Sequence, residues 1–474
     1  MTSAQIKYSA ATIRDGITFD LLVFLSGCWL NNVAYESLQP TLAAVIFWTI
    51  GATPLWLLGS NLRPERSIFT RLFAIGWFAA GIAAIYAEVL QDPLQLGSDA
   101  GSFFDLARGE AGGLSIEDIR VFTEGAGAIL LWRAVYDGFA AIGFDRARYV
   151  GILINVCAIA LTGVLGVRMI RIIYGHDIER INRLTTMFSF CGLLWLFASI
   201  HLRDAVVLLV VTGNCLIWVR YLAAPKANAI PWLIVTNLVF FSGLALLRTE
   251  FAFVPIAMLL GAVGSFALST GLGTRRRLLF VLAGAAILSL AAATYTDLSD
   301  DALFALSRGS ETYSAQANEQ AATGSMGLTL IVNQPLAVRL PLGLAYLFVF
   351  PIPFWSGFQL ETAASLFKSF NALFFYALTP LAGLAVVRIW QQRALRNRVN
   401  VFLVLVTFGF ALAIAGTSLE TRHFGAFISP LFMLALLPDL RQDTERRAYR
   451  SLLVCLLGLL AAVHVAWILL KLAA

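Results

Sequence analysis

The chain has 474 residues, of which 59% are apolar and only 13% are charged. A soluble chain carries about 25% charged residues, so this composition excludes a soluble enzyme and a disordered scaffold. The net charge of +6 does not indicate a nucleic-acid partner, because the basic residues lie in short loops between apolar runs.

The apolar residues come in runs of about 20, the length of a helix that crosses a hydrocarbon core of about 30 Å. We therefore predict an all-α polytopic membrane protein, with residues 1–474 in a single transmembrane domain. About 13 transmembrane helices are expected, over residues 17–34, 41–59, 72–91, 149–170, 184–200, 205–222, 230–247, 251–271, 278–295, 367–387, 401–417, 425–438 and 451–470.

Basic residues predict the orientation of these spans. Short loops rich in Lys and Arg stay cytoplasmic, and 22 of the 34 basic residues fall on one side of the predicted topology. All of them can be cytoplasmic only if the apolar stretches 126–143 and 341–358 do not cross the membrane. The N-terminus is then cytoplasmic and the C-terminus lies outside.

Both stretches have reasons not to cross. Residues 126–143 contain Arg133 and Asp137 one helical turn apart, which suits a helix lying in the membrane interface. Residues 341–358 should form a re-entrant or surface element, because prolines interrupt a helix there. These prolines are Pro341, Pro351 and Pro353.

Two long loops should lie on the extracytoplasmic side. The first, residues 92–148, includes the interfacial helix and an acidic segment with Asp99 and Asp105. The second, residues 296–366, is rich in Ser, Thr, Ala and Gln and includes the re-entrant or surface element.

Three tight turns on the same side each combine an arginine with a carboxylate. Charges at membrane depth are costly and mark functional sites, so together they predict a site for an anionic headgroup. The alternative is that they are ion pairs that seal loop ends. No metal-ligand spacing is present, and no metal residue is predicted. The residues of the turns are His201, Arg203 and Asp204; Arg248 and Glu250; and Glu420, Arg422 and His423.

This arrangement resembles the GT-C superfamily of membrane glycosyltransferases. The segment from Gly97 to Ala107 looks like the family's Asp-x-x-x-[Tyr/Phe]-x-x-x-Ala element in the first extracytoplasmic loop. The resemblance implies that Asp99 is the catalytic base, with Asp105 as a second carboxylate. The turns are similar to those of bacterial surface-polysaccharide members, as is the Pro351–Trp355 segment. The family's carboxylate doublet is here Ser98–Asp99, so metal dependence and the donor class stay open.

The resemblance implies transfer of a sugar or oligosaccharide from a polyprenyl (undecaprenyl) phosphate or diphosphate carrier. The acceptor would be a glycan or a lipid-linked glycan at the outer face of the bacterial inner membrane. Arginines pair bidentately with phosphate, so Arg203, Arg248 and Arg422 would hold the leaving group. No cofactor besides the carrier is predicted, and the surrounding partners are membrane lipids.

Several functions stay open on the sequence. A transferase of single sugars and a polymerase of repeat units would use the same chemistry. A flippase or other transporter of lipid-linked oligosaccharide is the main alternative, although such proteins usually show paired halves and charges near the membrane midplane. A structural subunit of an assembly is the third. The oligomeric state is not predicted.

Overall fold

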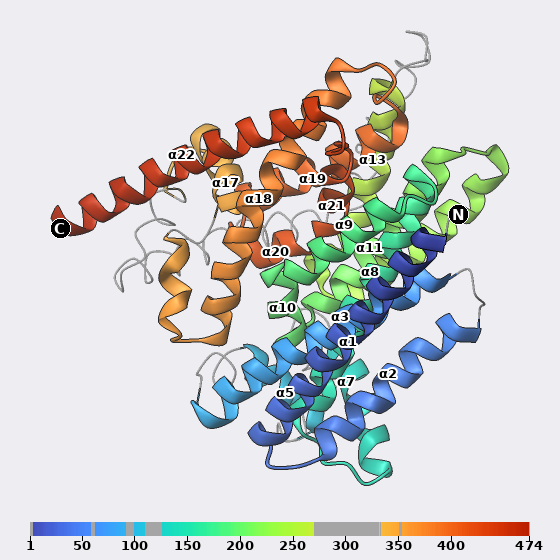
Figure 1. Ribbon diagram of the computed structural model, residues 1–474, viewed down its shortest axis with the longest axis vertical. Coiled ribbons are helices and arrows are strands. Elements are labelled where there is room, and N and C mark those ends of the chain that lie inside the picture. Colours follow the sequence, from blue (N-terminus) through green and yellow to red (C-terminus); the bar gives the residue numbers. More distant parts are fainter. Residues whose placement is uncertain are drawn as a thin grey trace, which may run out of the picture.

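The computed structural model describes residues 3–57, 62–91, 99–109, 126–269, 331, 333–349 and 353–473. Every regular element in these ranges is a helix, which confirms the prediction of a polytopic helical membrane protein (Figure 1). Within them, nine helical segments are long and apolar enough to cross a membrane. They are α2 (Gln39–Leu57), α3 (Arg63–Ala84) with its π-helical end η2 (Ile85–Val89), α8 (Arg148–Tyr174), α11 (Asp204–Ala223), α12 (Ile230–Leu247), the 3₁₀ turn η4 (Thr249–Phe253) with α13 (Val254–Leu268), α18 (Ala363–Gln391), α19 (Arg398–Gly416) and α22 (Asp443–Ala473).

A tenth segment is a broken helix where one span was expected over residues 184–200. Helices α9 (Ile178–Phe190) and α10 (Gly192–Ser199) meet at an angle of 58°. The break lies against α18, where a Cβ on Gly192 would be 2.2 Å from the Phe367 carbonyl oxygen. Asn371 of α18 accepts a hydrogen bond from the Leu193 N–H at 3.1 Å. Because protein groups satisfy the interrupted backbone, the break is tolerated at membrane depth.

Three other expected spans are not among the nine segments found in the described residues. Residues 17–34 lie in α1 (Ser3–Ala34), which packs along α3 but is not one of the nine segments. Residues 425–438 do not form one span. They hold α21 (Ile428–Ala435), preceded by α20 (Thr421–Gly425), and eight residues of helix reach only about 12 Å. Every residue of α21 is buried in protein, so its apolar run reflects the core and not lipid. Residues 278–295 lie outside the described residues.

The described parts of the two stretches predicted not to cross are mostly helical. Residues 126–143 contain α7 (Gly127–Ala141), which packs against α8, α12 and the short helix α5 (Asp99–Arg108). Helix α17 (Leu336–Val349) keeps Pro341 inside it, where the sequence predicted an interruption. The 3₁₀ turns η5 (Phe354–Gln359) and η3 (Ala227–Ala229) complete the described elements. The interfacial and re-entrant placements stay predictions.

Helices α3, α8 and α11 form the centre of the bundle, and α8 is the most deeply buried span. Helices α12 and α22 instead leave most of their apolar side chains exposed, as lipid-facing helices do. Helix α22 lies at the margin of the molecule, and its C-terminal end extends away from the bundle (Figure 1).

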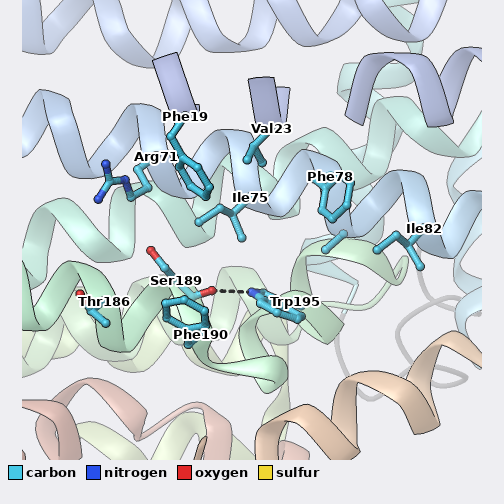
Figure 2. Close-up of a pocket in the computed structure, with 11 residues that line it drawn as sticks. Phe19, Val23, Arg71, Ile75, Phe78, Ile82, Thr186, Ser189, Phe190 and Trp195 are labelled. Atoms are coloured by element: carbon cyan, nitrogen blue, oxygen red, sulfur yellow. Dashed lines mark hydrogen bonds between the residues drawn. The ribbon is translucent and has the colours of Figure 1, made fainter. Parts of the chain in front are cut away.

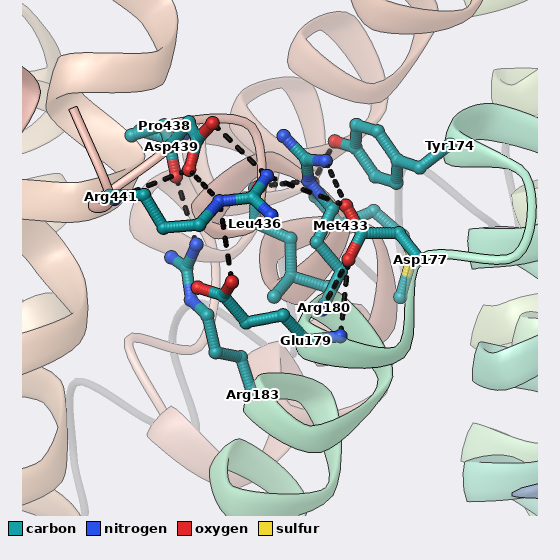
Figure 3. Close-up of polar contacts among 10 residues, drawn as sticks. All are labelled: Tyr174, Asp177, Glu179, Arg180, Arg183, Met433, Leu436, Pro438, Asp439 and Arg441. Atoms are coloured by element: carbon teal, nitrogen blue, oxygen red, sulfur yellow. Dashed lines mark hydrogen bonds and ion pairs between the residues drawn. The ribbon is translucent and has the colours of Figure 1, made fainter. Parts of the chain in front are cut away.

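A basic cluster closes the C-terminal end of α21, where backbone carbonyls lack helical partners (Figure 3). Arg183 donates to the carbonyls of Pro438 and Ala435 at 2.9 and 3.1 Å. Arg180 donates to the Leu436 carbonyl at 3.1 Å. Beside them Arg441 pairs with acidic side chains, which are Asp177, Glu179 and Asp439. We call this group, with Tyr174, the basic clamp; it fastens the buried helix to α8 and α9.

Candidate functional site

Arg248 joins the three turns that the sequence singled out. It caps the end of α12 and is only 7% exposed. Its Nη1 lies 3.5 Å from Oδ1 of Asp204, and its Nε donates to Oε2 of Glu250 at 3.2 Å. Its Nη2 donates to Nε2 of His423 at 2.8 Å. The structure therefore brings the turns together around one buried guanidinium.

His423 is held as a neutral acceptor. A guanidinium can only donate, so Nε2 of His423 carries no proton, and Nδ1 donates to Ser418 Oγ at 2.8 Å. Burial, together with the charges of Arg248, Arg422 and Arg203, holds the pKa of His423 well below its ordinary value. The imidazole therefore adds no positive charge near neutral pH.

The third turn presents a partly exposed ion pair. Arg422 Nε donates to Oε2 of Glu420 at 2.6 Å, and the two side chains are 26% and 36% exposed. The residue before Glu420, Leu419, has a φ of 52°. A side chain other than glycine is strained there, at a typical cost of about 1–3 kcal/mol, and such strain is found mostly at functional sites.

Lys368 on α18 is a site residue that the sequence analysis missed. Its charge interacts with those of Glu420 and Arg422. A signal was available, because Lys368 is a charged residue within the predicted span 367–387. The site then combines four basic side chains with three carboxylates. The cations are Arg203, Arg248, Lys368 and Arg422, and the carboxylates are Asp204, Glu250 and Glu420. We call these seven residues the cation site.

Arg203 reaches the cation site from a turn that α8 holds in place. Its Nη1 donates to the Leu247 carbonyl at 3.2 Å, next to Arg248. The amide of Asn155 donates to the carbonyls of Ile200 and Leu202 at 2.8 and 2.9 Å. Asn155 is fully buried on α8 and so fixes the backbone just before Arg203.

Helix α5 carries both predicted acidic residues, and it packs on α7 beside the Arg203 turn. The ring of Phe103 lies under the guanidinium of Arg203, at 5.5 Å. Asp99 is the first residue of α5 and precedes Phe103 by four positions, which places both on one face of the helix. Asp105 is exposed and two positions after Phe103, about 200° around the helix. The register thus places residue 99 on the Phe103 side of α5 and Asp105 on the opposite side.

His201 does not lie among the charges of the cation site. It is fully buried, its Nε2 is 2.9 Å from the hydroxyl of Tyr136, and its ring lies 4.1 Å from that of Trp132. Burial and the nearby charge of Arg148 lower the pKa of His201 to about 3. A neutral ring packed in this way suits an internal contact, and a role in holding a lipid phosphate is not what this geometry favours.

An apolar groove of about 240 Å³ lies between α1, α3, α9 and α10 (Figure 2). Its polar groups already have partners within the protein, so it suits a hydrocarbon chain. Arg71 bonds Asp20, Thr186 and Ser189 bond carbonyls of α9, and the indole of Trp195 bonds the Ser189 carbonyl. Trp195 also contacts Phe367 and Phe370, which flank Lys368 in α18. The groove therefore adjoins the helix that carries Lys368.

Among the described residues, no three His, Cys, Asp or Glu side chains gather as a metal site. No protein-family model, curated protein or solved structure matches the chain. The functional proposal therefore depends on the sequence motifs and on the geometry of the cation site.

Proposed function

We propose that the protein is a membrane glycosyltransferase of the GT-C type. It takes a sugar or oligosaccharide from a polyprenyl phosphate or diphosphate carrier and joins it to a glycan or lipid-linked acceptor. The reaction takes place at the extracytoplasmic face of the bacterial inner membrane. The observation that carries the proposal is the cation site, in which separate helices bring three further basic side chains near a buried Arg248.

The charge balance supports phosphate binding. Three carboxylates pair with the guanidiniums, and the basic side chains outnumber them by one without counting the neutral His423. Glu250 and Glu420 are 43% and 36% exposed, so the site borders an accessible region and is not sealed within the bundle. An incoming phosphate can then replace these carboxylates as the acceptor of the arginine hydrogen bonds. The apolar groove beside α18 offers space for part of the carrier's hydrocarbon chain.

The chemistry requires a base near this phosphate. Asp99 takes the proton from the acceptor hydroxyl as that oxygen bonds to the anomeric carbon. The bond from this carbon to the carrier phosphate breaks, and its electron pair stays on the phosphate oxygen beside the arginines. A single displacement of this kind inverts the anomeric centre. The register of α5, which sets Asp99 on the face of Phe103 and Arg203, supports this assignment over Asp105.

The direct test is transfer by the purified protein. A radiolabelled polyprenyl-phosphate sugar and the lipid-linked glycan pool of a deletion strain would be incubated with the wild-type protein and with Arg248→Ala. The proposal expects a new glycosidic product with the wild-type protein and little with the variant. A folded wild-type protein that binds carrier lipid but forms no product with any donor in the pool would contradict it.

A lipid-linked oligosaccharide transporter is the second candidate function, and the broken α9–α10 segment favours it. Discontinuous helices commonly build the binding sites of transporters. Flipping of a fluorescent lipid-linked glycan in vesicles separates the two functions. A transporter moves the lipid across the bilayer unchanged, whereas a glycosyltransferase changes its glycan and leaves its sidedness alone.

A further inference from the structure

Two neighbouring rings dock α5 onto the rest of the molecule. Phe104 lies edge-on to Tyr136 and His201, with ring centroids 5.9 and 5.7 Å apart. Phe103 packs between Trp132, at 6.3 Å, and the guanidinium of Arg203. Each aromatic pair contributes about 0.5–1.5 kcal/mol beyond its buried area. The position of α5 therefore depends on α7 and on the turn that carries His201.

A single hydrogen bond joins these two supports. Tyr136 of α7 and His201 are both fully buried and bond at 2.9 Å. Gly151 of α8 leaves the space for this bond. A Cβ at that position would lie 2.3 Å from Nε2 of His201 and 2.4 Å from the hydroxyl oxygen of Tyr136. The close approach requires glycine, since any larger residue would push the two side chains apart.

The same face of α8 fixes the remainder of the turn. Asn155 follows Gly151 by one helical turn and bonds the carbonyls on either side of His201. Two residues after His201, Arg203 enters the cation site. The contacts of His201 thus connect α5, through Phe104, with the backbone that presents Arg203.

We infer that His201, Tyr136 and Gly151 are positioning residues that set where α5, and with it Asp99, stands relative to Arg203 and Arg248. The inference rests on the proposed function for its catalytic meaning, but the mechanical part stands on the packing alone. Burial raises the pKa of Tyr136 well above its ordinary value and lowers that of His201, so neither group changes charge near neutral pH. A change of protonation therefore does not break the contact near neutral pH.

Hydrogen exchange of the α5 backbone amides tests the mechanical part in the purified full-length protein. Tyr136→Phe deletes only the hydroxyl, and Gly151→Ala inserts a Cβ between the partners. Both should speed exchange in α5 by roughly tenfold to a hundredfold, the factor typical of losing a buried hydrogen bond. Gly138→Ala, on the same helix as Tyr136, is the matched control, because its added Cβ would have no neighbouring atom within 4 Å.

Transfer kinetics test the catalytic part. Tyr136→Phe should lower kcat per folded molecule by about tenfold or more and leave the KM for the lipid donor unchanged. A merely destabilised protein would keep the wild-type kcat per folded molecule. Unchanged exchange in Tyr136→Phe overturns the inference, whatever happens to Gly151→Ala. If the wild-type protein shows no transfer but the variants show faster exchange in α5, the positioning role stands and the proposed function is wrong. Faster exchange with unchanged kcat removes the catalytic meaning.

Discussion

The cation site and the basic clamp are both rich in arginine, yet Arg248 in the first and Arg183 in the second meet different partners. In the clamp, Arg180 and Arg183 donate to backbone carbonyls at the end of α21, which need donors in any case (Figure 3). In the cation site, Arg248 forms ion pairs with two carboxylates and donates to a neutral histidine. A backbone carbonyl is fixed by the fold and cannot move away from its arginine. A partly exposed carboxylate side chain can move aside, so that a phosphate takes its place beside the arginine.

We infer that the groups which an arginine contacts, more than the number of arginines in a cluster, decide whether it supports the fold or binds a ligand. The sequence favoured these turns over the other basic clusters because the predicted topology places the turns outside and the clusters in the cytoplasm. The structure adds a chemical reason for the same preference. Substitutions at the two clusters should accordingly change different quantities, activity at the cation site and stability at the clamp.

The largest effect is expected at α5, next to the cation site. Asp99→Asn keeps the shape of the side chain and removes the proton acceptor, so turnover should fall by roughly 10²–10⁴ while the donor lipid still binds. Asp105→Asn, on the exposed face of the same helix, is the matched control and should stay close to wild type. Product formation and donor binding would be measured on the same purified proteins. An active Asp99→Asn variant would move the base elsewhere.

The next effect concerns Arg248. Replacement by Ala removes a preorganised contact to the leaving group, for which a loss of about 10²–10³ in rate is typical. Arg248→Lys should recover little of it, because an ammonium cannot reach Asp204, Glu250 and His423 in the planar geometry of a guanidinium. Steady-state transfer rates per folded molecule check this expectation. Full recovery by lysine would show that only charge matters there.

At the clamp the effect should appear in stability. Arg183→Ala leaves the Pro438 and Ala435 carbonyls without their donor, which costs about 1–3 kcal/mol for buried groups. Thermal unfolding in detergent should therefore begin at a lower temperature, with an unchanged transfer rate per folded molecule. A strong loss of rate with normal stability would erase the distinction between the two clusters.

The smallest effect is a change of stability with pH. The pKa of His201 is lowered to about 3 in the folded protein by burial and by Arg148, against about 6.5 in an unfolded chain. Below pH 6.5 the unfolded state therefore binds more protons, and stability falls by up to about 1.4 kcal/mol per pH unit. The drop in unfolding temperature between pH 7 and pH 5.5 should be smaller for His201→Gln. An equal drop would mean that His201 is not held neutral.

Composition and the lengths of apolar runs were enough to predict the helical class and most of the spans, since burial in lipid needs about 20 apolar residues. They could not predict α21, because a helix buried on every side by protein is as apolar as a span. The break at Gly192 was equally hidden, since it depends on the backbone of α18 coming close.

The three charged turns were visible because charges are rare in this sequence. Their convergence on Arg248 could not be predicted, since a single sequence does not show which helix ends lie close together in the fold. Lys368 could have been noticed as a charge within an apolar run. The neighbours of His201 could not be predicted, because they come from α7 and α8, more than 40 residues earlier in the chain.

Binding of polyprenyl phosphate tests the central claim most directly, because it needs neither the sugar nor the acceptor to be known. Native mass spectrometry would compare the wild-type protein with Arg248→Lys at the cation site and Arg183→Lys at the clamp. The account predicts that the lipid phosphate binds to wild type and to Arg183→Lys with similar affinity, and at least tenfold more weakly to Arg248→Lys. Equal weakening by both substitutions, or by neither, would contradict it.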